Sequence, residues 1–369
     1  MATPKVNPED SAMAWRIHKK GLLPVTMKKE TIPIPEPKQG EVLVEVHSAS
    51  INPVEWKIPA HAPGFFQKFP RSIGTDFSGV ILRTGSSLTP DQQSRFQPGT
   101  RVLGMIPTET SVRYGQGSLT THVSVRVENL AAIPASIDTS LSSEEAAGLP
   151  LASSTALHLV RKARAGDKVL VLGGSTSVGL ILLQMLKAEG VGHIVATASG
   201  DKKDTVKKRG ADEVIDYREE DVVQTLKRNH SREQFDVILD TVGDFAVFGA
   251  CAAYLKESGE YANVGASDMK PDGSIWSNLS VVRNIVSLYL PWWLGGVPRK
   301  SSWGEFVRGA MPEVTDRYLV TNIVTCPIDS RFTFDDAPKA YERLMTGRAL
   351  GKIIVNIKHP SDPAVRSHL

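Results

Sequence analysis

The chain has little cysteine, no long apolar run and no strong excess of either charge. Only two of its 369 residues are cysteines, Cys251 and Cys326, which excludes a disulfide framework and a cysteine-rich zinc site. The most apolar stretch, residues 281–296, is interrupted by Arg283 and Pro291, so no segment reaches the ~20 apolar residues of a membrane span. A net charge of +3 without a dense basic stripe argues against nucleic acid as a partner.

The N-terminal sequence carries no targeting signal of a familiar kind. MATPKVNPEDSAMAW has no apolar core and is neither arginine-rich nor free of acids, unlike a signal peptide or a mitochondrial presequence. We therefore expect a cytoplasmic protein. Its length favours two domains.

The first part of the chain has a β-rich pattern. Residues 40–53 alternate apolar and polar side chains with period two, as a half-buried strand does. Further short strands are expected around residues 76–83, 101–105 and 120–127, separated by Gly, Pro and Ser clusters. This spacing predicts a small, irregular β-barrel.

The pattern changes after Ile133-Pro134. Residues 141–149 and 153–165 favour helix, and buried-strand runs then alternate with helical segments. The expected strands are 169–172, 193–198, 213–217, 235–240 and 260–264, followed by β-rich residues 325–333, a helix over 334–345 and a last strand at 352–357. Such alternation predicts an α/β fold with a doubly wound parallel sheet. We expect one domain from residues 1–135 and 322–369 and another from residues 136–321.

The most informative stretch is residues 168–190, KVLVLGGSTSVGLILLQMLKAEG. A buried strand enters a turn of small residues, which opens into a helix with an apolar face. Such a turn can place a diphosphate at the helix N-terminus, although similar turns also occur in sheets that bind no nucleotide. The candidate cofactor residues here are Gly173, Ser175, Thr176, Ser177, Val178 and Gly179.

The end of the next strand favours NADPH over NADH. An NAD enzyme usually places an acid there on the ribose, but this strand ends at Ala198-Ser199-Gly200 with Lys203 nearby. A hydroxyl and an ammonium suit a 2′-phosphate. Asp201 would be the ribose acid if the strand ran two residues longer. The other candidates at strand ends are Tyr217, Val242, Asn263, Val264 and Gly265; Tyr217 could equally be an ordinary half-buried strand residue.

The nine histidines show no spacing typical of zinc ligands. We expect no metal, so the groups that polarise a hydride acceptor must be hydroxyl, amide, ammonium or the cofactor itself.

Several motifs occur in an order typical of one family. They are INPVEWK (51–57), GTDFSGV (74–80), PGTRVLG (98–104), GSLTTHVSV (117–125), EEAAGLPLASSTAL (144–157), GADEVIDY (210–217), ILDTVG (238–243) and GKIIVNI (351–357). The chain resembles the zinc-independent medium-chain dehydrogenases/reductases, near the zeta-crystallin-like quinone oxidoreductases, the reticulon-interacting oxidoreductases and the fungal trans-acting enoyl reductases. The resemblance covers residues 43–357. It implies a GroES-like catalytic domain, a Rossmann domain and NADPH bound between them.

The resemblance also implies particular roles. Asn52 lies in the segment that approaches the nicotinamide, and Lys57 and Thr155 flank the substrate carbonyl. The resemblance also implies that Gly351 and Lys352 contact the cofactor. Lys57 could instead be a surface lysine, and the Thr155 hydroxyl could bond its own helix. Where zinc-dependent relatives carry Cys and Gly-His-Glu, this chain has Asn52 and Gly-Thr-Asp at residues 74–76, which excludes catalytic zinc.

The chain departs from the family at two places. Thr176 replaces a glycine of the common turn, and its hydroxyl, with those of Ser175 and Ser177, could bond the phosphates. The aromatic segment 288–306 is longer than quinone reductases need; it could line a substrate channel, form a dimer contact, touch a membrane surface or pack over the cleft.

We therefore expect an NADPH-dependent oxidoreductase that transfers hydride to an activated alkene (an enone or enoyl thioester) or a quinone. The partner is a small molecule, and the protein is a monomer or homodimer. The alternative is an NADPH-binding interaction or sensing protein with little turnover. A tailoring reductase acting in trans would differ from the first mainly in its acceptor.

Overall fold

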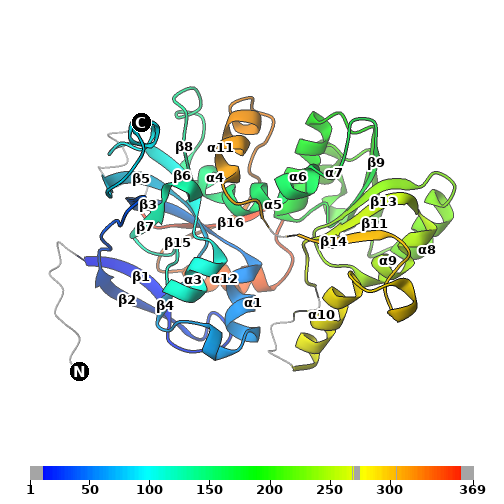
Figure 1. The fold of residues 1–369 in the computed structure, drawn as a ribbon, viewed down its shortest axis with the longest axis horizontal. Helices are drawn as coiled ribbons and strands as arrows, with labels where there is room; N and C mark the ends of the chain where they lie inside the picture. The colour runs from blue at the N-terminus through cyan, green and yellow to red at the C-terminus, as the bar shows by residue number, and fades with distance from the viewer. Residues whose placement is uncertain (1–10, 268, 270–274, 305, 359–369) are drawn as a thin grey trace. The chain divides into compact units, whose positions relative to one another are not determined.

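The computed structural model describes residues 11–267, 269, 275–304 and 306–358. The chain forms two compact units (Figure 1). The first unit comprises Met1–Leu151, Arg308–Val320 and the residues from Ile328 onward. The second comprises Ala152–Val307 and Thr321–Pro327, so it is inserted into the sequence of the first.

The first unit is built around a seven-stranded, mostly antiparallel sheet of order β15-β16-β3-β5-β6-β8, with β7 paired to β3. A smaller sheet has the order β2-β1-β4. The strands are β1 (Ser11–Ile17), β2 (Met27–Pro33), β3 (Glu41–Ile51), β4 (Arg71–Ser72), β5 (Asp76–Thr84), β6 (Arg101–Met105), β7 (His122–Arg126), β8 (Leu130–Ala132), β15 (Ile328–Thr333) and β16 (Lys352–Asn356). The last strand, β16, lies inside the sheet next to the edge strand, because it pairs in parallel with β15 and antiparallel with β3.

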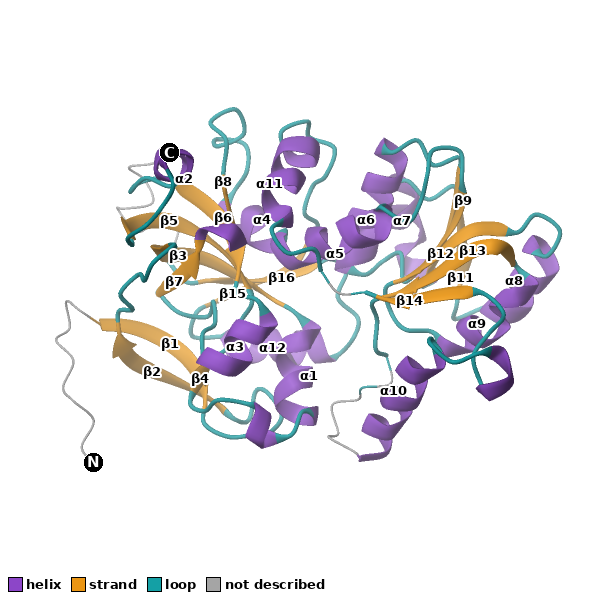
Figure 2. Ribbon diagram, viewed as in Figure 1, coloured by secondary structure: helices purple, strands orange, loops and turns teal. Residues whose placement is uncertain are grey.

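Short helices cover this unit (Figure 2). They are α1 (Pro53–His61), α2 (Pro90–Arg95), α3 (Thr108–Tyr114), α4 (Ser143–Gly148), α11 (Ala310–Val314) and α12 (Ala337–Met345). Helix α1 starts at Asn52-Pro53, where a proline at the first helical position suits the fixed proline φ. Trp56 of α1 and Tyr341 of α12 belong to one apolar core with Ile51 and Ile353. This packing brings the start of α1 against α12.

The second unit has a six-stranded sheet of order β11-β10-β9-β12-β13-β14, all parallel. The strands are β9 (Lys168–Leu172), β10 (His193–Ala198), β11 (Glu213–Asp216), β12 (Phe235–Asp240), β13 (Leu255–Asn263) and β14 (Lys300–Trp303). The helices are α5 (Pro150–Val160, which starts in the first unit), α6 (Ser177–Ala188), α7 (Lys203–Lys208), α8 (Val222–His230), α9 (Phe245–Ala250) and α10 (Ile275–Ser287). Residues 169–172 and 194–198 are buried throughout, as in a sheet covered on both faces. The sheet order reverses beside β9, which is the topological switch point of a Rossmann fold.

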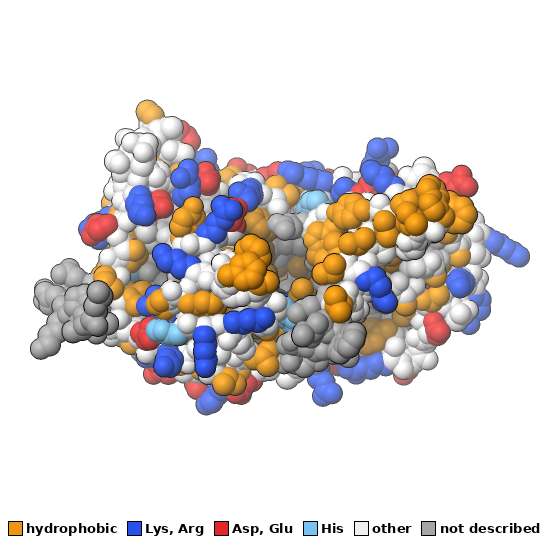
Figure 3. Space-filling model, turned by 60° about the horizontal axis from the view of Figure 1, so that its bottom comes forward, with side chains coloured by type: hydrophobic (Ala, Val, Ile, Leu, Met, Phe, Trp, Pro, Cys, Tyr) orange, Lys and Arg blue, Asp and Glu red, His pale blue; other side chains and the backbone are white. Residues whose placement is uncertain are grey.

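Hydrophobic side chains also gather on the surface of the second unit (Figure 3). Helix α10 exposes Leu279, Val282 and Val286, spaced three and four residues apart on one helix face, and Trp292 and Trp293 follow at 64% and 67% exposure. No described helix combines the length and apolarity needed to cross a bilayer.

Candidate functional site

The turn after β9 is shaped by two glycines. Gly173 has a φ of +77°, a left-handed conformation that favours glycine. A Cβ on Gly179 would lie 2.2 Å from the Gly173 carbonyl oxygen, so only glycine lets α6 start this close to the turn. Thr176 is the N-cap of α6, and its Oγ1 accepts a hydrogen bond from the Gly179 amide at 2.9 Å. The Thr176 hydroxyl therefore caps α6, and its contact with a phosphate stays a prediction.

The structure brings this turn together with two other predicted strand ends. The Gly173 amide donates to Thr197 Oγ1 at 2.9 Å, and Thr176 Oγ1 lies 3.0 Å from Thr241 Oγ1. A Cβ on Gly265 would lie 2.1 Å from the Val242 carbonyl carbon. The carboxyl ends of β9, β10, β12 and β13 thus form one continuous edge, where open α/β sheets bind their ligands.

A buried carboxylate holds one loop of this edge in place. Asp240 is fully buried and accepts hydrogen bonds from the amides of Val242, Gly243 and Asp244 at 2.7–2.9 Å. The Tyr261 hydroxyl also donates to it at 2.6 Å. Burial raises the pKa of Asp240, and these four donors oppose that shift. Asp240 therefore positions the loop that contains Val242.

The next loop contains a buried polar group with no protein partner. Asn263 Oδ1 accepts from the Gly265 amide at 2.6 Å. Its Nδ2 is buried and has no hydrogen-bond acceptor in the described part of the chain. A buried donor that the protein leaves unsatisfied is a candidate contact for a ligand or a water molecule. Val264, between the two, donates its amide to the Asp240 carbonyl at 2.9 Å.

The end of β10 has the basic character that the sequence indicated. The strand stops at Ala198; Ser199 is fully buried and Lys203 begins α7. Asp201 lies beyond the strand and forms an ion pair with Arg218 at 3.4 Å. Arg218 follows Tyr217, which is half exposed. Sequence reasoning did not single out Arg218, although a cation directly after Tyr217, a predicted cofactor residue, was a usable signal.

A dinucleotide fits this edge of the second unit. The turn at Gly173–Gly179 leaves no room for Cβ atoms beside α6, and the helix N-terminus favours a diphosphate. Lys203 and Arg218 provide two cations beside the end of β10. Asn263 adds the buried amide donor described above.

The first unit holds a second group of predicted residues around Asn52. The Asn52 amide group donates to Asp76 Oδ2 at 2.9 Å and to Glu55 Oε1 at 3.3 Å. Lys352 Nζ donates to Asn52 Oδ1 at 2.7 Å and to Asp76 Oδ2 at 3.0 Å. Asp76 is fully buried and Lys352 is 2% exposed. The structure thus places Lys352, a predicted cofactor residue, in a buried polar network, and Gly351 directly before it is buried.

Glu55 extends this network toward α12. It is buried, and the Tyr341 hydroxyl donates a hydrogen bond to its Oε2. Burial and the nearby charge of Asp76 raise the pKa of Glu55 to about 7, although hydrogen bonds from Tyr341, Thr75 and Asn52 oppose the shift. Near neutral pH the carboxyl group is therefore partly protonated. Sequence reasoning did not single out Glu55, although it lies inside the INPVEWK motif.

The two predicted catalytic side chains lie in different units. Lys57 is half-buried on α1, with Nζ 5.8 Å from the centre of the Trp56 ring. Burial lowers the pKa of Lys57 to about 8. Thr155 lies on α5 with 9% of its surface exposed. Their convergence on one carbonyl stays a prediction.

Within the described residues, no group of three or more His, Cys, Asp or Glu side chains could hold a metal ion. The positions at which zinc-dependent relatives carry ligands are occupied by Asn52 and Thr75, and Asp76 is engaged with Lys352.

Comparison with known proteins agrees with this architecture. Residues 38–135 match the alcohol dehydrogenase GroES-like domain, and residues 209–355 match the zinc-binding dehydrogenase family. The fold is similar to the quinone oxidoreductase of Coxiella burnetii, with a TM-score of 0.75 and 23% identity over 94% of this chain and all of that one. The two units are thus those of a medium-chain dehydrogenase/reductase, as the motifs predicted.

Curated relatives connect the chain to particular oxidoreductases. It is 32% identical over 311 residues to the trans-enoyl reductase poxH of Penicillium oxalicum, covering 77% of this chain and 78% of the relative. It is 29% identical over 375 residues to the mitochondrial NAD(P)H oxidoreductase RTN4IP1 of Mus musculus, covering 93% and 89%. The chain belongs to the medium-chain dehydrogenase/reductase family of nicotinamide-dependent oxidoreductases, and its relatives include enoyl reductases.

Proposed function

We propose that the protein is an NADPH-dependent reductase that acts, without zinc, on an activated alkene (an enone or enoyl thioester) or a quinone. The observation that carries this proposal is the dinucleotide-shaped edge of the second unit, with Lys203 and Arg218 beside the end of β10. The enoyl reductase and NAD(P)H oxidoreductase relatives support the reaction class.

The residues of the second unit would hold the cofactor by its phosphates. The amides at the start of α6 would bind the diphosphate, while Lys203 and Arg218 would pair with the 2′-phosphate. Arg218 also neutralises Asp201, the acid that could otherwise accept a ribose hydroxyl. When bound, NADPH supplies the hydride.

The chain's own contribution to the reaction is to stabilise negative charge on the acceptor oxygen. Lys57, with its pKa lowered to about 8 by burial, remains mostly protonated at pH 7 and can donate a hydrogen bond to a developing oxyanion. The Thr155 hydroxyl is the second donor that the family resemblance implies. Fixed donors of this kind are worth about 100-fold or more in rate.

The test is stopped-flow oxidation of NADPH and NADH with quinones, short enones and crotonyl thioesters. We expect turnover with at least one class and a preference for NADPH. Lys203→Ala combined with Arg218→Ala should weaken NADPH binding while NADH binding changes little, and Lys300→Ala, an exposed cation on β14, is the matched control. Tight NADPH binding without turnover of any acceptor would refute the reductase.

The exposed aromatic segment supports one alternative, an NADPH-binding protein that acts through partners. Trp292, Trp293 and Leu294 are each more than 60% exposed, a patch that monomeric proteins rarely present without a use. In that case NADPH binding would persist without turnover, and capture of a partner protein would depend on Trp292 but not on Lys57.

A further inference from the structure

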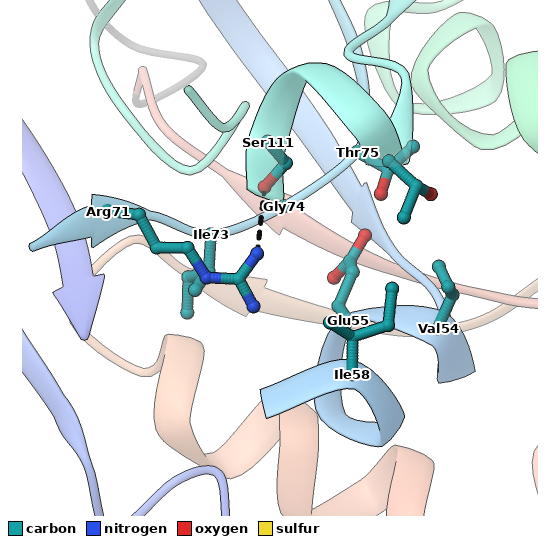
Figure 4. A pocket seen from close by; sticks show the side chains of 9 residues that line it. Val54, Glu55, Ile58, Arg71, Ile73, Gly74, Thr75 and Ser111 are labelled. Atoms are coloured by element: carbon teal, nitrogen blue, oxygen red, sulfur yellow. Dashed lines mark hydrogen bonds between the residues drawn. The ribbon is translucent and has the colours of Figure 1, made fainter. Parts of the chain in front are cut away.

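The first unit contains a small pocket next to the Asn52 network. Its empty space of about 290 Å³ includes open solvent, so the enclosed part is much smaller. Its lining residues are Val54, Glu55, Ile58, Arg71, Ile73, Gly74, Thr75, Thr108 and Ser111. The side chains of Arg71 and Glu55 approach the pocket from opposite sides (Figure 4). The two groups thus face the same small space.

Arg71 is a buried cation whose hydrogen-bond partners are neutral. Only 4% of its surface is exposed. Nη1 donates to Ser111 Oγ at 3.3 Å and Nη2 to Gln67 Oε1 at 3.2 Å, while Nε is buried and finds no acceptor among the described residues. Burial lowers the pKa of Arg71 to about 10, with the charges of Tyr341 and Glu55 opposing the shift. Arg71 is therefore charged at neutral pH, and a buried charge normally has an ion partner.

Glu55 does not fill the role of a direct ion partner. Its oxygens accept hydrogen bonds from Tyr341 and Asn52, and no hydrogen bond joins it to Arg71 within the described chain. The charged and titratable groups around it are Arg71, Asp76 and Tyr341, with Lys352 paired to Asp76. When Glu55 is neutral, the pocket carries the uncompensated charge of Arg71.

We propose that this pocket binds the carboxylate of a small organic acid, which pairs with Arg71. A guanidinium has five N–H donors, and the two bonds to Ser111 and Gln67 leave donors for two carboxylate oxygens. A planar two-oxygen anion matches the fork geometry of arginine. The enclosed part of the pocket is far smaller than the ~300–1,000 Å³ of ordinary ligand sites, so only the carboxylate head group enters it and the rest of the acid lies toward the solvent-open side.

The position of the pocket connects it to the acceptor. Val54 lines it and follows Asn52-Pro53, the segment that the family resemblance places beside the nicotinamide. The bound carboxylate would then belong to the substrate, and the preferred acceptor is an activated alkene that also carries a carboxylate. This second step depends on the proposed function, whereas binding of a carboxylate does not.

Binding is tested on the full chain without cofactor, by calorimetry and thermal unfolding with sodium acetate and propionate at constant ionic strength. Inorganic phosphate and chloride are the comparison anions. We expect saturable binding of the carboxylates and weaker binding of phosphate and chloride. Because ionised Glu55 repels the ligand, affinity should fall above pH 7, by up to about tenfold per pH unit.

Three variants and one control identify the site. Arg71→Met should lower carboxylate affinity about 10- to 100-fold, and Ser111→Ala should lower it less. Glu55→Gln should retain binding but lose its pH dependence. The control Arg113→Met removes a 67% exposed arginine of α3 and should change neither the carboxylate affinity nor its pH dependence. If Arg71 serves a ligand, Arg71→Met without ligand should unfold at the same or a higher temperature than wild type.

Substrate preference is tested with an acid and ester pair, trans-4-oxo-2-pentenoate and its methyl ester, by NADPH oxidation. We expect a higher kcat/KM for the acid, and Arg71→Met should reduce the acid-to-ester ratio about 10- to 100-fold. No turnover of either compound would refute the proposed function and leave the binding result standing. Equal binding of all anions, no binding by the wild type, or binding unchanged in both Arg71→Met and Ser111→Ala would overturn the pocket assignment.

Discussion

Replacing Lys352 by methionine removes the positive charge from the buried network of the first unit. Methionine keeps most of the apolar stem, so packing changes little. Asp76 Oδ2, now 3.0 Å from Lys352 Nζ, would keep only neutral donors. These are Ser50 Oγ at 3.2 Å and Asn52 Nδ2 at 2.9 Å, with the Leu151 amide at 2.9 Å from Oδ1. A fully buried carboxylate would then have no counter-ion.

Breaking a buried ion pair by removing one partner costs about 3–5 kcal/mol. Because three hydrogen-bond donors to Asp76 remain, we expect a cost at the lower end of this range. Lys352→Met should therefore reduce the free energy of unfolding by about 3 kcal/mol. The double variant Asp76→Asn with Lys352→Met contains neither charge. It should recover most of that loss, because a neutral amide is far less costly to bury.

The assay is urea unfolding of the single and double variants, followed by circular dichroism and hydrogen exchange of β3 and β16. Lys300→Met is the matched control: Lys300 also forms an ion pair, with Glu260, but is 71% exposed, so the loss should stay below about 1 kcal/mol. A loss below 1 kcal/mol for Lys352→Met, or additive losses in the double variant, would refute the reasoning. NADPH titration of the folded variant tests separately whether Lys352 touches the cofactor.

Three further predictions concern single groups. The pKa of Glu55 is about 7 in the folded state against an ordinary value of 4.5, so between these pH values the folded state binds one more proton than the unfolded state. The free energy of unfolding should therefore fall by up to about 3 kcal/mol as the pH rises through that window. Glu55→Gln should flatten this pH profile, which is measured by urea titration. Thr176→Ala should lower the free energy of unfolding by about 1 kcal/mol through loss of the N-cap, with little change in NADPH affinity. Gly179→Ala, whose Cβ would lie 2.2 Å from the Gly173 oxygen, should clearly weaken NADPH binding in a fluorescence titration. If the two variants bound NADPH with equal affinity, the structural role of Thr176 would be contradicted. Because the pKa of Lys57 is about 8, kcat/KM for an enone should fall above pH 8. Lys57→Met should lower kcat/KM about 100-fold and abolish this fall above pH 8. A pH profile that is unchanged in the variant would exclude Lys57 as the donor to the oxyanion.

Most strands of the second unit were predictable because they are short apolar runs between glycine-rich turns. Residues 193–198 and 235–240 form strands with the expected bounds, as do residues 101–105 of the first unit. Strand β14 (Lys300–Trp303) was not predicted. Strand β2 was missed because its sequence, MKKETIP, is mostly exposed. Helix α1 was missed because it begins at Asn52-Pro53 and contains Pro59, a pattern that usually indicates a turn.

The site was predictable only where the chemistry is local in sequence. The Gly173 turn carries its own signal, since a strand, a turn and a helix adjoin there. The Glu55–Tyr341 contact joins residues 286 positions apart, and no periodicity connects them. Arg71 resembles any polar residue of an edge strand until packing buries it. Long-range packing therefore determines which polar residues become functional candidates.

The order of elements along the chain has a consequence for biosynthesis. Lys352 meets Asp76 only after 276 further residues have been added, and β16, which carries it, lies between β15 and β3 in the first sheet. During translation the β-strands of the second unit are complete by residue 303, before this counter-ion exists. The first unit thus begins to be synthesised first but completes its sheet last. A ribosome-bound chain stopped before residue 352 contains Asp76 without its counter-ion Lys352.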